Sequence, residues 1–221
     1  MNAPSSPYDS LVLSYLTLRK AVGILGISLP VVLAVGGTIF CGLELQRSIS
    51  SYYYSGKRNL FVGILCSIAV FLLSYRGYEL QDKIASFLAG LFTLGVAFFP
   101  TTSNDTPSET QQLIGYVHLA SAAAFFLTIS CISLFLFTKT DPTKPPTPKK
   151  LQRNKAYKSC GWIILGAIFL IGVYKIIGFY KLASLDNLNP VFWLESVAQL
   201  AFGASWLVKG EAILRDEILA E

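Results

Sequence analysis

Apolar positions occur in long unbroken runs along this chain, and polar positions gather in the segments between them. Six runs approach or exceed the length that lets a helix cross a bilayer, about 20 residues for about 30 Å. The runs cover 21–43, 60–78, 84–99, 113–137, 160–182 and 191–208. They are longer than barrel strands of about 10 residues, and their apolar positions do not alternate. The pattern predicts an all-α fold, a polytopic bundle of six transmembrane helices forming a single domain over 1–221.

Composition agrees with this prediction. The 221 residues are 53% apolar and 14% charged, with a mean hydropathy of +0.54. A soluble domain carries about 25% charged residues. These values exclude an ordinary soluble domain and predict a multi-pass membrane protein, in a bacterial inner membrane or a plasma membrane.

The distribution of basic residues predicts the orientation. With the N-terminus inside, thirteen of the 18 lysines and arginines fall on the inner side. The positive-inside rule therefore places both termini in the cytoplasm. Segment 139–158 contains four prolines and seven basic residues, which predicts an irregular cytoplasmic linker close to anionic lipid. Nucleic acid is not an expected partner, because basic cytoplasmic loops are usual in membrane proteins.

Small residues mark one helix as closely packed. In the third run Ala85, Ala89, Thr93 and Ala97 recur every four residues, with Gly90 beside them. Small side chains at this spacing let helix backbones approach each other within lipid. The pattern predicts that the third helix is central in the bundle.

Three ionisable residues lie inside the predicted spans at similar depth. His118, Lys175 and Glu195 are each five to seven residues from the outer end of a span, which at 1.5 Å per residue is about 7 to 10 Å. Such residues are costly in lipid and are functional candidates. Gln199 lies one turn after Glu195 on the same helix face. An ion pair of Glu195 with Lys175 and a proton-accepting His118 is one interpretation. The other interpretation is that the Lys175 side chain reaches the outer surface, while His118 and Glu195 are satisfied by hydrogen bonds within the bundle.

The stretch SSYYYSGKRN, residues 50–59, lies in the predicted first outer loop. Three tyrosines at a membrane surface are typical of an aromatic belt. Arginine and lysine beside hydroxyls suit a phosphate or carboxylate. The primary prediction is that the stretch anchors the chain at the membrane surface. The secondary prediction is that it forms the rim of an outward-facing polar vestibule. The candidate ligand-binding residues of this vestibule are Glu44, Arg47, Tyr52, Tyr53, Tyr54, Lys57, Arg58, His118, Lys175, Glu195 and Gln199.

Two segments carry a family resemblance. FFPTT, residues 98–102, ends the third run, and HLASAAAFF, residues 118–126, follows the start of the fourth. With the six-span layout, they resemble six-helix bacterial integral membrane proteins grouped as a family of unknown function, and more distantly the DRAM and Sfk type of membrane protein. The resemblance implies membrane residence and lipid-linked regulation, and adds weight to His118 as a residue of the outer vestibule.

The leading functional hypothesis is non-enzymatic. The vestibule is expected to bind a lipid head group or a small anionic or zwitterionic solute, with membrane lipids as partners, and transport of this ligand is left open. One alternative is a membrane-embedded lipid hydrolase or transferase using Ser51, His118 and Glu195, although no G-x-S-x-G motif surrounds a serine. Another is a structural partner of other membrane proteins, and homo-oligomerisation stays open. No metal site or cofactor is expected, since the chain has one histidine and its cysteines lie within or beside apolar runs.

Overall fold

The structure is a computed structural model that describes residues 7–42, 44–77, 79–103, 106–140, 143, 145–178 and 188–214. All regular elements in these residues are helical, which confirms the all-α prediction. The α-helices are α1 (Pro7–Cys41), α2 (Arg58–Ser74), α3 (Leu80–Phe98), α4 (Glu109–Cys131), α5 (Pro148–Gly178) and α6 (Pro190–Lys209). A 3₁₀ turn, η1 (Ser50–Tyr54), precedes α2, and a π-helical turn, η2 (Ile132–Leu136), extends α4.

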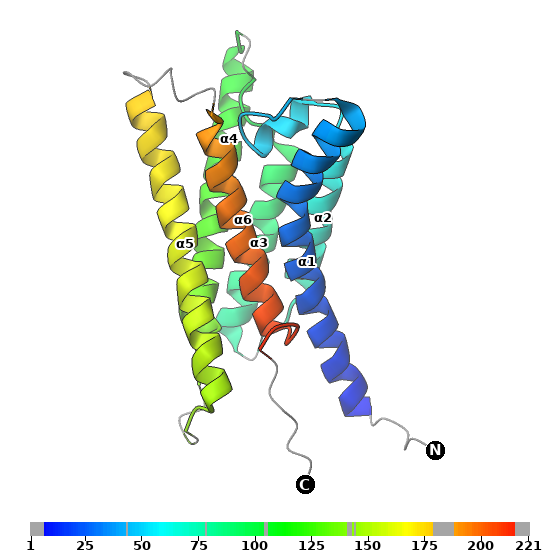
Figure 1. Ribbon diagram of the computed structural model, residues 1–221, viewed down its shortest axis with the longest axis vertical. Coiled ribbons are helices and arrows are strands. Elements are labelled where there is room, and N and C mark those ends of the chain that lie inside the picture. The colour runs from blue at the N-terminus through cyan, green and yellow to red at the C-terminus, as the bar shows by residue number, and fades with distance from the viewer. Residues whose placement is uncertain are drawn as a thin grey trace.

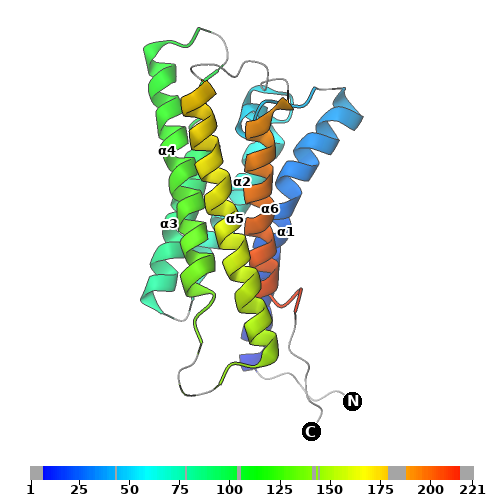
Figure 2. The ribbon, with the colours of Figure 1, turned by 60° about the vertical axis from the view of Figure 1, so that its left-hand side comes forward.

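The six helices form a closed ring in chain order (Figures 1 and 2). Each helix packs against the next along the chain, and α6 also packs extensively against α1. The start of α1 and the end of α6 lie at the same end of the bundle (Figure 1). Polar groups that point into this ring are therefore shielded from the surroundings by helices on every side.

Five helical segments are long and apolar enough to cross a membrane. They are Tyr15–Gly36, Leu80–Phe98, Glu109–Leu136, Pro148–Ile176 and Pro190–Lys209. The sixth, α2, has 17 residues, which at 1.5 Å per residue reach about 26 Å. That length is at the lower limit for a transmembrane helix. The chain has the architecture of a multi-pass membrane protein.

The prediction of an irregular linker is wrong over 148–158, because α5 begins at Pro148. Thr147 caps this helix: its side-chain oxygen accepts a hydrogen bond from the Lys150 amide at 3.1 Å. Proline is favoured at the first helical position, because an N–H there would have no carbonyl partner within the helix. The basic residues after it are good helix formers. The positive charge of this segment is therefore held on a rigid scaffold.

The prediction that the third helix is central is also wrong. In the span of α6, 61% of the residues are buried, against 33% for α3 and 17% for α5. The small-residue face of α3 does pack closely, because a Cβ added at Gly90 would lie 2.7 Å from Leu73 Cγ of α2. At the α1–α6 contact a Cβ at Gly203 would meet a backbone atom, the Gly23 carbonyl oxygen, at the same distance of 2.7 Å.

An ion pair joins Lys139, shortly after η2, to the start of α3. Lys139 Nζ lies 2.7 Å from Glu79 Oε2 and 3.9 Å from Asp82 Oδ1. Glu79 and Asp82 also cap the start of α3 reciprocally. The hydrogen bond with Glu79 raises the pKa of Lys139, so its ammonium stays charged to a higher pH than that of an isolated lysine. This contact ties the lower end of α3 to the chain that leaves η2.

Candidate functional site: a polar vestibule above a buried network

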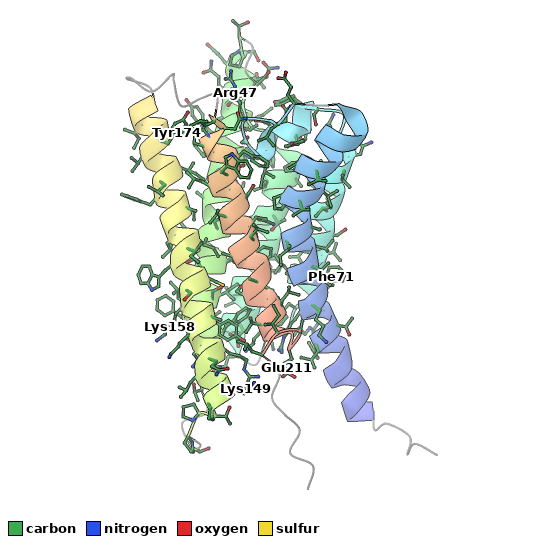
Figure 3. The ribbon with its side chains drawn as sticks, viewed as in Figure 1. Arg47, Phe71, Lys149, Lys158, Tyr174 and Glu211 are labelled. Carbon is green, nitrogen blue, oxygen red and sulfur yellow. The ribbon has the colours of Figure 1, made fainter. Side chains whose placement is uncertain are left out.

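A polar pocket of about 240 Å³ lies at the end of the bundle where α6 begins. We call it the vestibule. Figure 3 shows two of its residues, Arg47 and Tyr174, near the start of α6. The vestibule is lined by Arg47, Ser48, Ser51, Thr101, Thr102, Tyr174, Lys175, Asn189, Pro190 and Val191. Four separate parts of the chain therefore meet there: the loop after α1, the loop after α3, the end of α5 and the start of α6.

Backbone contacts hold the loop after α1 against α6. The Phe192 amide donates to the Arg47 carbonyl at 3.1 Å, close to the first turn of α6. The hydroxyls of Ser48 and Ser51 are 2.7 Å apart, and the Ser51 amide donates to Ser48 Oγ at 3.0 Å. These bonds close a compact turn, so Arg47 and Ser51 are presented on one wall of the vestibule.

The vestibule is positively charged. Arg47 and Lys175 are both exposed and both line it, and its described lining contains no aspartate or glutamate. The same lining contains the hydroxyls of Ser48, Ser51, Thr101 and Thr102. Guanidinium and ammonium groups next to hydroxyl donors are suited to phosphate or carboxylate oxygens.

Beneath the vestibule, Glu195 anchors the same loop from below. Its Oε2 accepts a hydrogen bond from the Ile49 amide at 2.6 Å. The amide and hydroxyl of Ser50 also contribute hydrogen bonds to this carboxyl group, and Lys175 interacts with it electrostatically. Segment 48–51 thus presents Ser48 and Ser51 to the vestibule, and Ile49 and Ser50 to the interior.

His118 extends this network across the bundle. Its Nδ1 lies 2.7 Å from the Phe99 carbonyl oxygen, and its Nε2 lies 2.9 Å from Ser50 Oγ. A carbonyl oxygen only accepts, so Nδ1 carries a hydrogen and donates to Phe99. In the neutral ring Nε2 is then the acceptor, and the Ser50 hydroxyl donates to it.

Ser50 therefore lies between two ionisable groups. When His118 is neutral, the Ser50 hydroxyl donates to its ring, as described above. When His118 is protonated, Nε2 donates to Ser50 Oγ, which leaves the hydroxyl hydrogen for the Glu195 carboxylate. One hydroxyl therefore interacts with both ionisable groups.

A cavity of about 40 Å³ adjoins the network. Its lining is mostly apolar, and its polar groups come from Ser50, Thr93, Glu195 and Gln199. The Gln199 side chain is 3% exposed, and its Nε2 has no hydrogen-bond partner within the described residues. A water needs about 10–15 Å³, so the cavity has room for water to serve this donor.

The tyrosines of η1 take three different positions. Tyr52 is fully buried against Phe192, with ring centroids 6.4 Å apart. Tyr53 pairs with Arg58, whose guanidinium carbon lies 4.2 Å from the ring centroid. Tyr54 is 53% exposed and donates to the Thr101 carbonyl at 2.7 Å. Burial raises the pKa of Tyr52 and of Tyr54, so both are neutral hydroxyls at physiological pH.

The structure divides the predicted site residues into three groups. Arg47 and Lys175 line the vestibule, whereas His118, Glu195 and Gln199 lie in the buried network or at its cavity. The remaining residues lie outside both linings: Glu44, Tyr52, Tyr53, Tyr54, Lys57 and Arg58.

Sequence reasoning missed several residues of the site. It selected Ser51 as the hydroxyl beside His118 and Glu195, whereas the structure places Ser50 there. It also missed Thr101, Thr102 and Asn189. The polar run that follows Pro100 was the available signal for the two threonines.

Among the described residues, no three histidine, cysteine, aspartate or glutamate side chains come together as a metal site. Comparison with protein family models, curated proteins and solved structures finds no match for this chain. The resemblance to six-helix membrane families stays a prediction. The function is argued from the geometry of the vestibule and its network.

Proposed function

We propose that the vestibule binds a phosphate or carboxylate group, carried by a lipid head group or by a small anionic or zwitterionic solute. The observation that carries this proposal is the convergence of Arg47 and Lys175, from distant parts of the chain, on one hydroxyl-lined pocket. Arginine offers a planar fork of donors for two ligand oxygens, and lysine adds a point charge.

The size of the vestibule favours a head group over a whole lipid. Its volume of about 240 Å³ is below the roughly 300–1,000 Å³ of pockets that enclose drug-sized ligands. Side-chain oxygens of Thr101 and Asn189 lie in the same lining and can accept from the ammonium of a zwitterionic ligand. An acyl chain would have to remain outside, against the apolar surface of the bundle.

The test is mass spectrometry of the species that co-purify with the chain in mild detergent, followed by titration with the anion that is found. The Arg47→Gln, Lys175→Gln double variant should weaken binding about tenfold or more, because charged hydrogen bonds are worth about 1.5–3 kcal/mol each. The matched control is Lys57→Gln with Arg58→Gln, which removes the same charge at the start of α2, outside the vestibule.

The control pair should leave binding within about twofold of wild type. Equal occupancy in wild type and in the Arg47, Lys175 pair would refute the proposal. If both double variants lost the same amount of binding affinity, the effect would come from general electrostatic attraction at this surface. That result would also contradict a specific binding site in the vestibule.

One observation favours a second function, a membrane-embedded hydrolase. Ser50 Oγ and His118 Nε2 are 2.9 Å apart, and the Phe99 carbonyl orients the other ring nitrogen. A nucleophile, a base and an orienting group have this arrangement in hydrolases. It ranks second because Ser50 is 8% exposed and faces a cavity of about 40 Å³, which is too small for a lipid ester.

The hydrolase function predicts that a fluorophosphonate labels the wild-type chain at Ser50. Labelling should disappear in Ser50→Ala, fall strongly in His118→Gln, and persist in Ser51→Ala, the neighbouring hydroxyl that faces the vestibule. The readout is intact-mass spectrometry. A wild-type chain that stays unlabelled, beside a serine hydrolase that is labelled in the same detergent, contradicts this function.

A further inference from the structure

The cavity of about 40 Å³ that adjoins the buried network lies inside the ring of helices, beside Ile49 and Ser50. Its lining comes from these two residues and from α1, α2, α3, α4 and α6. It shares no lining residue with the vestibule, which is lined by the neighbouring Ser48 and Ser51. The cavity is therefore a separate site, and a molecule bound in it would lie within the ring.

Gln199 provides a buried hydrogen-bond donor that faces this cavity. The residue lines the cavity and is 3% exposed, and its Nε2 atom has no hydrogen-bond partner among the described residues. A buried amide that donates no hydrogen bond is costly, because it has given up its partners in water without replacing them. The large majority of buried polar groups have a partner in the protein or an ordered water. Gln199 therefore requires an acceptor that the described side chains around it do not supply.

Two other residues of the lining offer acceptors. The buried Thr93 hydroxyl donates its hydrogen to a carbonyl of its own helix at 2.7 Å, so its oxygen keeps lone pairs that can accept. The Glu195 carboxyl group accepts from the Ile49 amide and from Ser50, and two carboxyl oxygens have capacity for about four hydrogen bonds. Neither acceptor lies within hydrogen-bonding distance of Gln199 Nε2. A small molecule between them could accept from Gln199 and donate to the other two.

The size and the polarity of the cavity both fit water. A bound water needs about 10–15 Å³ and about two to four polar partners. The volume of about 40 Å³ gives room for two or three waters, and it is too small for a solute or a head group. A cavity with only apolar walls stays dry, whereas Gln199, Thr93 and Glu195 offer one donor and two acceptors in this lining. Water is therefore the ligand that this cavity can hold.

From these observations we infer that the cavity is an internal water site. A bound water accepts from Gln199 Nε2 and donates to the Thr93 oxygen and to the Glu195 carboxyl group, directly or through a second water. The water joins α3 to the buried network, because the described hydrogen bond of Thr93 stays within α3. Since Glu195 holds the Ile49 amide, the water also supports the segment that forms one wall of the vestibule. The site does not depend on the function proposed for the vestibule.

The test is X-ray radiolytic footprinting of the full chain in detergent, read by mass spectrometry. The X-ray pulse splits water where it is bound, and the hydroxyl radicals oxidise the side chains next to it. Leu29 of α1 and Leu65 of α2 line the cavity and are 2% and 5% exposed. Leu33 and Leu72, on the same two helices, are also buried but lie outside the lining. We expect the two lining leucines to be oxidised several-fold faster than these two control leucines.

Variants test whether the oxidation comes from water held in this cavity. Ala122→Val adds two methyl groups to the lining and leaves every polar side chain in place. The matched control, Ala123→Val, makes the same change at a residue of the same helix outside the lining. Gln199→Met removes the donor and keeps the length of the side chain. Oxidation of the two lining leucines should fall to the level of the control leucines in Ala122→Val. It should fall several-fold in Gln199→Met and stay unchanged in Ala123→Val.

The wild-type chain alone can overturn the inference, so the test does not depend on whether a variant folds. If its lining and control leucines are oxidised at the same rate, the cavity is dry. Fast oxidation that persists in Ala122→Val would come from water elsewhere, and fast oxidation that persists in Gln199→Met would show that Gln199 holds no water. Either result overturns the inference. A loss of oxidation in Ala123→Val as well would show that the oxidation reports general packing, which also contradicts a water site.

Discussion

Replacing Gly203 with leucine should destabilise the bundle by about 3 kcal/mol, the upper part of the usual range for overpacking. A Cβ at this position would lie 2.6 Å from Ile27 Cγ1, 2.7 Å from the Gly23 carbonyl oxygen and 2.8 Å from the Ile27 amide nitrogen. Two of these three atoms are backbone, so no rotamer change relieves the clash. Helices α1 and α6 would have to separate.

The measurement is the thermal unfolding temperature of the purified chain in detergent, with the monodisperse fraction from size-exclusion chromatography. Gly166→Leu on α5 is the matched control, since a Cβ at Gly166 meets no atom within 4 Å. That variant should unfold within a few degrees of wild type. If both variants unfold at the same temperature, the close α1–α6 contact is not what closes the ring.

The second large effect is expected at His118. His118→Ala should cost about 2 to 4 kcal/mol, because it leaves the Phe99 carbonyl and the Ser50 hydroxyl without the ring and opens a cavity. Segment 48–51 should loosen with it. Hydrogen exchange should report this loosening as lost protection of the Ile49 and Ser50 amides.

Two comparisons separate the loss of hydrogen bonds in the network from a general packing defect. Leu119→Ala shortens a side chain on the exposed side of the same helix, where Leu119 is 57% exposed, and should have little effect. Ser50→Ala alone should cost about 1 kcal/mol, and its combination with His118→Ala should cost less than the sum. Strictly additive costs would show that Ser50 and His118 do not act together.

The sequence predicted the helices that are long and apolar enough to span a membrane, because such runs depend on local composition. Apolar runs indicate spans regardless of how the helices pack against one another. Ionisable residues such as His118 and Glu195 are easily recognised inside these runs. The start of α5 was also recoverable. Thr147 followed by Pro148 is a helix start signal, which the count of prolines in the segment obscured.

Contacts between distant segments could not be read from the chain in the same way. Ser50 and Ser51 are adjacent, and which of them meets His118 depends on a 3₁₀ turn and on a helix 68 positions away. The small residues of α3 are frequent enough to form a pattern, whereas the burial of α6 comes from its packing against both α1 and α5, which no local pattern shows.

The closure of the ring by α6 has a consequence for biogenesis. Helices enter the membrane in order of synthesis, so α1 to α5 wait as an open arc until α6 arrives between the two ends. Glu195 and Gly203 both belong to α6, so the acceptor for the Ile49 amide and the α1 contact are supplied in a single late step. A translation product that stops before α6 therefore lacks the Glu195 acceptor for the Ile49 amide and leaves the face of α1 around Gly23 uncovered. Membrane quality control can distinguish it from the finished chain by that exposure alone.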